Sequence, residues 1–250
     1  MTLPRSFLDR PIAHRALHDR ADGRPENSRE AILAAVAAGY GIEIDVQCSR
    51  DGQAMVFHDY DLSRLTAETG AIGSYDAADL QGISLAGGAT GIPTLQQVLS
   101  LVAGAVPLLI EIKDQDGAMG PDVGPLGAAV AQALNGYAGS VALMSFNPQA
   151  VEEMATLCPD RPRGLTTCSY TAQDWPTLPA RVRDDLRDIP DFDRVGASFI
   201  SHEARDLDRP RVSDLKAGGI PILCWTIKSP MQEQEARRVA DNITFEQYTP

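Results

Sequence analysis

The chain has 250 residues, 44% hydrophobic and 22% charged, and contains no apolar run long enough to cross a bilayer. Its formal net charge of -12 disfavours binding to nucleic acid or to an anionic membrane, because both depend on dense positive patches. We therefore predict a soluble globular protein without stable membrane insertion, acting on a small molecule. If that molecule carries a phosphate, the positive charge that receives it must be local.

The four cysteines are scattered without C-x-x-C spacing, which argues against a zinc site or a disulfide framework (Cys48, Cys158, Cys168 and Cys224). The first residues, MTLPRSFLDRP, lack the apolar core of a signal peptide. Both observations favour a cytoplasmic location with buried thiols. They leave the oligomeric state open.

The first predicted elements form a strand, a loop and a helix. Residues 11–15 are a short strand that ends in two polar residues, His14 and Arg15, and a loop rich in turn formers follows. Asn27 and Glu30 have the spacing of a capping box, so we expect a helix to begin there and to end at Gly39.

The next strand carries two acids in strict alternation with apolar residues, as GIEIDV at positions 41–46. A period of two sends Glu43 and Asp45 to one face and the three apolar residues to the other. Neighbouring carboxylates repel, so the pair suggests a hard divalent cation with oxygen ligands. The alternative is the exposed face of an edge strand.

An Asp51-Gly52 turn then predicts a hairpin, with residues 54–57 as an antiparallel return strand ending at His58 and Asp59. The loop is too short for a parallel crossover. The hairpin brings His58 back to the level of the two acids, where an imidazole can act on a bound group.

Residues 60–91 are polar, rich in glycine and only weakly periodic, and they are too long for an ordinary loop in a compact barrel. We interpret them as an insertion, either a lid or small subdomain beside the site or a tolerated surface excursion. Thr94 and Gln97 form a second predicted capping box, which begins a helix that ends at Gly104.

The strand at residues 107–113 places an acid and a base together at its end, Glu111 and Lys113, on the face opposite Ile110. Charges that deep in an apolar strand need partners. A plain ion pair satisfies them, but with a cation already suspected, Glu111 as a third ligand and Lys113 as a phosphate contact explain more.

Strands and helices continue to alternate to the end of the chain, and the parallel strands are predicted to begin near positions 11, 41, 107, 141, 163, 197, 220 and 242. Eight β/α units predict a closed (β/α)8 TIM barrel, with its chemistry at the C-terminal strand ends. Polar or aromatic side chains fall there (His14, Arg15, Glu43, Asp45, Glu111, Lys113, Ser145 and Trp225). An open doubly wound sheet is the competing fold, but no G-x-G-x-x-G or P-loop sequence supports nucleotide binding.

The motifs IAHR, PENS, GIEIDVQCSRDG, VFHD, IPTL, LLIEIK, MSF and CWTI occur in this order over nearly the whole chain. In this the chain resembles the glycerophosphodiester phosphodiesterase family. The resemblance implies one barrel domain over residues 1–250, with an insertion at about 60–91, after the His-Asp motif.

The resemblance also implies a role for each site residue. One divalent cation, Mg²⁺ or Ca²⁺, is expected on Glu43, Asp45 and Glu111, and His14 and His58 are the expected acid and base. Arg15 and Lys113 are expected to hold the phosphate of the substrate. Trp225 is either a wall for its glycerol moiety or part of the core.

By the same resemblance the reaction is hydrolysis of a glycerophosphodiester to sn-glycerol 3-phosphate and an alcohol. A dication, Arg15 and Lys113 together carry one more positive charge than the three carboxylates carry negative charge. The remaining positive charge matches a singly charged phosphodiester. The nucleophile is either water or the glycerol hydroxyl of the substrate, the latter giving a cyclic phosphate. Which histidine is the base stays open.

The sequence departs from the family pattern at Ala16, where the family has glycine, at Lys228 and at Glu246. These departures bear on substrate fit. We expect His18 to be solvated, and His202, at a strand end, either to line the pocket or to meet water.

Two rival functions remain. One is a phosphodiesterase of the lysophospholipase D or sphingomyelinase D kind, which needs an apolar groove for an acyl chain. The other is a catalytically silent barrel that binds polyol phosphates or acts as a scaffold.

Overall fold

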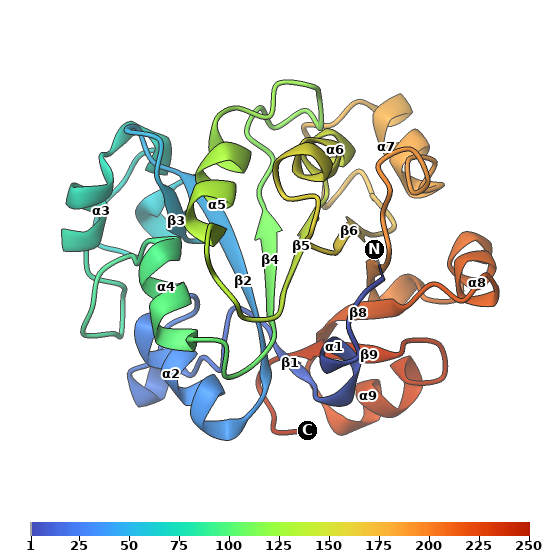
Figure 1. Ribbon diagram of the computed structural model, residues 1–250, viewed down its shortest axis with the longest axis horizontal. Helices are drawn as coiled ribbons and strands as arrows, with labels where there is room; N and C mark the ends of the chain where they lie inside the picture. The colour runs from blue at the N-terminus through green and yellow to red at the C-terminus, as the bar shows by residue number, and fades with distance from the viewer. Residues whose placement is uncertain (1) are drawn as a thin grey trace.

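The computed structural model describes residues 2–250 and shows a barrel of parallel strands with helices around it (Figure 1). The barrel strands are β1 (Ile12–Ala13), β2 (Gly41–Cys48), β4 (Leu108–Ile112), β5 (Val141–Ser145), β6 (Arg163–Thr167), β7 (Ile200–Glu203), β8 (Ile222–Ile227) and β9 (Asn242–Phe245). Each is parallel to its neighbours, and β1 pairs with both β2 and β9, which closes the sheet. The predicted (β/α)8 barrel is therefore confirmed.

The helices are α1 (Ser6–Asp9), α2 (Arg29–Ala38), α3 (Ala77–Gly82), α4 (Leu95–Val102), α5 (Leu126–Leu134), α6 (Pro148–Leu157), α7 (Ala180–Arg187), α8 (Pro210–Ala217) and α9 (Pro230–Ala236). Among residues 2–250, none has the length and apolar character needed to cross a membrane. The outward residues of the strands, such as Ile42, Ile44 and Ile110, pack with the helices in the largest core. The inward residues Leu109, Phe199 and Leu223 belong to a second cluster that fills the barrel interior.

The two predicted capping boxes have different outcomes. At α4 both hydrogen bonds between Thr94 and Gln97 are present, as predicted. At α2 the prediction was wrong, because Ser28 is the N-cap and its hydroxyl accepts from the Ala31 N–H. Asn27 has a φ of 58° and uses its amide on Asp45 instead. Gly39, with a φ of 73°, ends α2 as expected.

The hairpin and the insertion follow β2. Strand β3 (Ala54–Val56) runs antiparallel to β2, with Val56 opposite Val46. Three short helices follow, η2 (Leu62–Arg64), η3 (Ile72–Ser74) and α3, at the left of Figure 1. They enclose an apolar core of their own (Met55, Phe57, Leu62, Leu65, Ile72, Ala77, Leu80, Leu85 and Ile92). The insertion is therefore a structured subdomain. Its apolar residues are irregularly spaced, so the sequence pattern did not indicate this core.

Candidate active site

Three carboxylates meet inside the barrel at the ends of two neighbouring strands. Glu43 and Asp45 project from β2 and Glu111 from β4, with Asp45 directly beside Glu111 in the register of the sheet. Oxygen atoms of all three lie within 4.8 Å of one another. The three residues are only 2%, 2% and 6% exposed. The alternative of an exposed edge-strand face is excluded, since β2 is paired on both sides.

Two cations lie against this cluster. The Lys113 ammonium donates to Glu111 Oε1 at 2.6 Å and lies 3.0 Å from Asp45 Oδ1. Arg15 donates its backbone N–H to Glu43 Oε2 at 2.8 Å, and its guanidinium Nε lies 3.4 Å from Asp45 Oδ2. Asn27 adds a neutral hydrogen bond to Asp45 at 3.0 Å.

The charges of the cluster are unequally balanced. Burial raises the pKa of Asp45, but Lys113 and other nearby cations outweigh it and hold that pKa well below its usual range. Burial together with the charges on Asp45 and Glu111 raises the pKa of Glu43 well above its usual range. One carboxylate thus lacks a compensating charge, and three buried oxygen donors of this kind suit a hard divalent cation.

The turn after β1 brings Arg15 to the cluster through strained backbone. Arg15 and Ala16 have φ values of 50° and 67°, in the left-handed region where a residue with a side chain costs about 1–2 kcal/mol. The Ala16 N–H donates to the Glu43 carbonyl at 3.0 Å, which fixes this turn against β2. The glycine of the family motif at position 16 thus has a conformational reason, and this chain retains the conformation with alanine.

His14 is oriented by a carboxylate from the other end of the chain. Its Nδ1 lies 2.6 Å from Oε2 of Glu246, just after β9, and Lys228 pairs with the second oxygen of Glu246 at 2.7 Å. Burial lowers the pKa of His14, with Glu246 opposing the change. Burial raises the pKa of Glu246, but its contacts with His14, His18 and Lys228 outweigh burial and bring that pKa well below its usual range.

His18 joins the same group, with Nε2 at 3.4 Å from Glu246 Oε2. The expectation that His18 is solvated was wrong, because barrel closure brings Glu246 against its loop and leaves the side chain only 20% exposed. His14, His18 and Glu246 could in principle hold a cation. The ammonium of Lys228 already neutralises Glu246, so this group is better suited to orienting His14.

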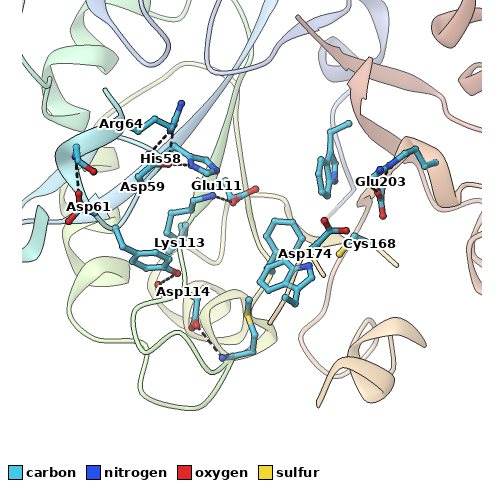
Figure 2. Close-up of a pocket in the computed structure, with 18 residues that line it drawn as sticks. His58, Asp59, Asp61, Arg64, Glu111, Lys113, Asp114, Cys168, Asp174 and Glu203 are labelled. Atoms are coloured by element: carbon cyan, nitrogen blue, oxygen red, sulfur yellow. Dashed lines mark hydrogen bonds and ion pairs between the residues drawn. The ribbon is translucent and has the colours of Figure 1, made fainter. Parts of the chain in front are cut away.

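His58 is oriented by its neighbour in the sequence. Its Nδ1 lies 2.6 Å from Asp59 Oδ1, and Arg64 holds the other oxygen of Asp59 at 2.6 Å (Figure 2). Burial raises the pKa of Asp59, but His58 and Arg64 outweigh it and the pKa lies below its usual range. Arg64 also pairs with Glu26, which in turn binds the guanidinium of Arg15 at 2.7 Å.

No role was predicted from the sequence for Glu26, Asp59, Arg64 or Glu246. Glu26 lies within the PENS motif and Asp59 within VFHD, so both carried a signal. Glu246 was noted only as a departure from the family. His202, in contrast, neither lines the pocket nor meets water, because it is fully buried and bonded to Thr167 and Asp206. Ser145 is also buried and donates to the Ile112 carbonyl.

Two of the cavities at this end of the barrel are lined by the predicted site residues. The inner pocket, of about 50 Å³, is lined by both histidines, the three acids, Arg15 and Lys113, together with Ser201, Trp225 and Thr244. An outer cleft of about 690 Å³ adjoins it and shares five of its residues (His58, Glu111, Lys113, Phe146 and Trp225). Trp225 is therefore a wall of both cavities and not part of the closed core.

A barrel with buried acids, cationic side chains and two oriented histidines at its C-terminal strand ends has the site architecture of a phosphate-ester enzyme. The model of the glycerophosphoryl diester phosphodiesterase family matches residues 14–243, and the chain belongs to this family of hydrolases. The predicted resemblance is thereby confirmed.

Individual proteins similar to this chain belong to the same family or share its fold. The Bacillus subtilis protein YhdW is 27% identical over 228 residues, which cover 87% of this chain and 86% of that protein. A phosphodiesterase of Oleispira antarctica, solved with the product sn-glycerol-3-phosphate, is 24% identical with a TM-score of 0.78, over 97% of this chain and 94% of the other. A glycerophosphodiester phosphodiesterase from Parabacteroides distasonis is 24% identical with a TM-score of 0.74, over 94% and 91% of the two chains. Both structures share the fold of this chain.

Proposed function

We propose that the protein hydrolyses glycerophosphodiesters to sn-glycerol 3-phosphate and an alcohol, using one divalent cation and a pair of histidines. The observation that carries the proposal is the meeting of three buried carboxylates with two oriented histidines in one pocket. Family membership supports the reaction class, and the product bound to the Oleispira relative supports the glycerol phosphate half of the substrate.

Glu43, Asp45 and Glu111 are the proposed ligands of the cation, Mg²⁺ or Ca²⁺, because both ions prefer carboxylate oxygens. The raised pKa of Glu43 fits this assignment, since the cluster lacks one positive charge. When bound, the cation supplies Lewis-acid polarisation of a non-bridging phosphoryl oxygen.

Arg15 and Lys113 are the proposed phosphate contacts, since both line the inner pocket and both already hold the acids. The same pocket is the proposed position of the glycerol moiety. The hydroxyls of Ser201 and Thr244 are buried there without a hydrogen-bond partner, and a buried hydroxyl left unpaired costs about 1–3 kcal/mol. Hydroxyl groups of the glycerol moiety can supply those partners, with Trp225 as the adjoining wall.

We assign the general base to His14 and the general acid to His58. Burial lowers the pKa of His14, which favours the neutral imidazole that can accept a proton. Glu246 occupies Nδ1 of His14 and Asp59 occupies Nδ1 of His58, which leaves Nε2 of each ring for proton transfer. His14 takes a proton from the nucleophile, water or the glycerol hydroxyl, and His58 gives one to the leaving alkoxide.

We also infer that the barrel and its insertion act as one catalytic domain, and that the protein works in the cytoplasm. All four cysteines are free and buried, as suits a reducing compartment.

A turnover assay tests the proposal. We expect glycerophosphocholine with Mg²⁺ or Ca²⁺ to yield sn-glycerol 3-phosphate, measured with a stereospecific dehydrogenase. Chelation should abolish turnover reversibly, and Glu43→Ala, Asp45→Ala and Glu111→Ala should each do so permanently while circular dichroism stays native. Glu235→Ala, an exposed acid on α9, is the matched control. Activity that persists after exhaustive chelation and dialysis would show the metal assignment to be wrong.

A further inference from the structure

The outer cleft has an aromatic wall that the chemistry of the inner pocket does not use. Phe146 follows β5, Trp175 lies in the loop before α7, and Trp225 is on β8. The ring centroids of Phe146 and Trp175 are 5.0 Å apart, and those of Phe146 and Trp225 are 5.6 Å apart with planes at 84°. All three side chains are half-buried, so three separate elements present a concave aromatic surface to the cleft.

The lining of the cleft also has more acids than bases. Six carboxylates face three basic side chains (Asp59, Asp61, Glu111, Asp114, Asp174 and Glu203 against Arg64, Lys113 and Arg205). Each base pairs with one acid of the lining, which leaves Asp61, Asp114 and Asp174 without a basic partner within 4.0 Å among residues 2–250. The carboxylates of Asp61 and Asp114 instead accept from backbone N–H groups or from the Asn147 amide. Asp174 precedes Trp175, and among the described residues its carboxylate accepts from the hydroxyl of Thr171 alone. It lies across the pocket from His58 and Arg64 (Figure 2).

The position of the cleft decides which part of a substrate reaches it. The inner pocket, of about 50 Å³, is too small to hold a whole diester, and it meets the outer cleft at His58 and Lys113. His58 is also the proposed donor to the leaving alkoxide. The alcohol part of the diester must therefore extend from His58 into the outer cleft.

We propose that the outer cleft is a subsite for the leaving alcohol and that it selects a quaternary ammonium head group, as in choline. The inference rests on the proposed function and names the preferred substrate within it. A quaternary ammonium ion donates no N–H hydrogen bonds, so aromatic faces and uncompensated carboxylates are its natural partners. The same carboxylates repel the carboxylate of a serine head group, which the choline and ethanolamine head groups lack.

An acyl chain is the competing occupant. The cleft is large enough to take one, but an alkyl chain packed on the lining would desolvate Asp174 without any compensating charge. The charge of the lining therefore favours the cationic alcohol.

The test compares four diesters of the same glycerol phosphate, with choline, ethanolamine, glycerol and serine as the alcohols. We expect kcat/KM to fall in that order. Trp175→Leu, which keeps apolar bulk, and Asp174→Asn should each lower kcat/KM for the choline diester about two- to fivefold. The same variants should leave the glycerol diester within about twofold. Asp188→Asn, an exposed aspartate outside the cleft, is the control for loss of one charge.

The outcomes separate this inference from the proposed function. Equal kcat/KM for all four alcohols, with glycerol phosphate released, would overturn the subsite and leave the function intact. Faster turnover of lysophosphatidylcholine than of glycerophosphocholine would replace the head-group subsite by an acyl groove. If no diester were hydrolysed, choline binding followed by tryptophan fluorescence would still decide, because the subsite requires saturable quenching that is weaker in Asp174→Asn, which retains both tryptophans. A melting temperature for each variant excludes unfolding as the cause.

Discussion

The two histidines of the inner pocket are held in the same way by very different stretches of chain. Each has a carboxylate oxygen 2.6 Å from Nδ1. For His58 this carboxylate is the next residue, whereas for His14 it is 232 positions away. We call each histidine and its carboxylate a dyad. Closure of the barrel between β1 and β9 forms the His14–Glu246 dyad, and the hairpin that follows β2 places the His58–Asp59 dyad. The comparison shows that one local and one long-range solution can produce equivalent geometry.

The two dyads differ in what lies behind them. Asp59 leads through Arg64 and Glu26 to Arg15, and so to the phosphate side of the pocket. Glu246 ends at Lys228 and His18, which touch none of the three acids. A change in the His58 dyad should therefore also affect substrate binding, while a change in the His14 dyad should affect proton transfer alone.

The largest expected effect comes from removing either imidazole. His14→Ala and His58→Ala should each lower kcat about 10²–10⁴-fold with little change in KM. A diester with p-nitrophenol as leaving group needs no proton, so it should restore much of the rate of His58→Ala and little of that of His14→Ala. Rescue of His14→Ala alone would show that His14 is the general acid and His58 the general base. Equal rescue of both would show that the two histidines do not have separate acid and base roles.

A smaller effect is expected from neutralising the carboxylates. Glu246→Gln and Asp59→Asn should each cost about 10–100-fold, the usual range for a residue that orients a functional histidine. Glu246 holds up the pKa of His14, which burial lowers, so its removal should lower that pKa further. The acid limb of the kcat/KM profile should then move to lower pH in Glu246→Gln, because His14 must be deprotonated to act as base.

Asp59→Asn provides the contrast for that profile. Its acid limb should stay in place, while KM rises because Arg64 and Glu26 lose their anchor beside Arg15. Acid limbs that move together in the two variants would mean that the dyads are not independent.

The smallest effect is expected at the outer end of the His14 dyad. Lys228→Gln removes a partly exposed ion pair with Glu246, a type of contact worth about 0–1 kcal/mol, so kcat should fall about two- to fivefold at most. Added salt should mimic the change in the parent protein and have little effect on the variant. A loss as large as that of Glu246→Gln would place Lys228 in the proton-transfer step itself.

Features that depend on local contacts could be predicted from the sequence, and features that depend on distant contacts could not. The acid pair of β2, the return strand and the fold class were readable, because each rests on periodicity or on a turn within a few residues. The contact between His14 and Glu246 was not, since it exists only once the eighth strand closes on the first. The contact of His18 with Glu246 was missed for the same reason.

The outer cleft shows a second limit. Phe146, Trp175 and Trp225 come from three distant segments, and none of these segments has a pattern that indicates a shared wall. The loop before α7, which contributes Trp175 and Asp174, was poorly determined from sequence because prolines interrupt its periodicity. The inner pocket was thus largely predictable and the outer cleft was not.

Strand β3 is a wall shared by two cores, with Ala54 and Val56 facing the barrel core and Met55 facing that of the insertion. For protein engineering this makes residues 60–91 an exchangeable module. A replacement segment must cover Met55 and Phe57 with apolar side chains and supply a base for Asp59 and Glu26 in place of Arg64. It must also replace contacts with the barrel, such as the hydrogen bond from the Tyr60 hydroxyl to the Asp114 carbonyl. Replacement of residues 60–91 would change the part of the outer cleft that this segment lines, while the backbone that carries His58 stayed the same.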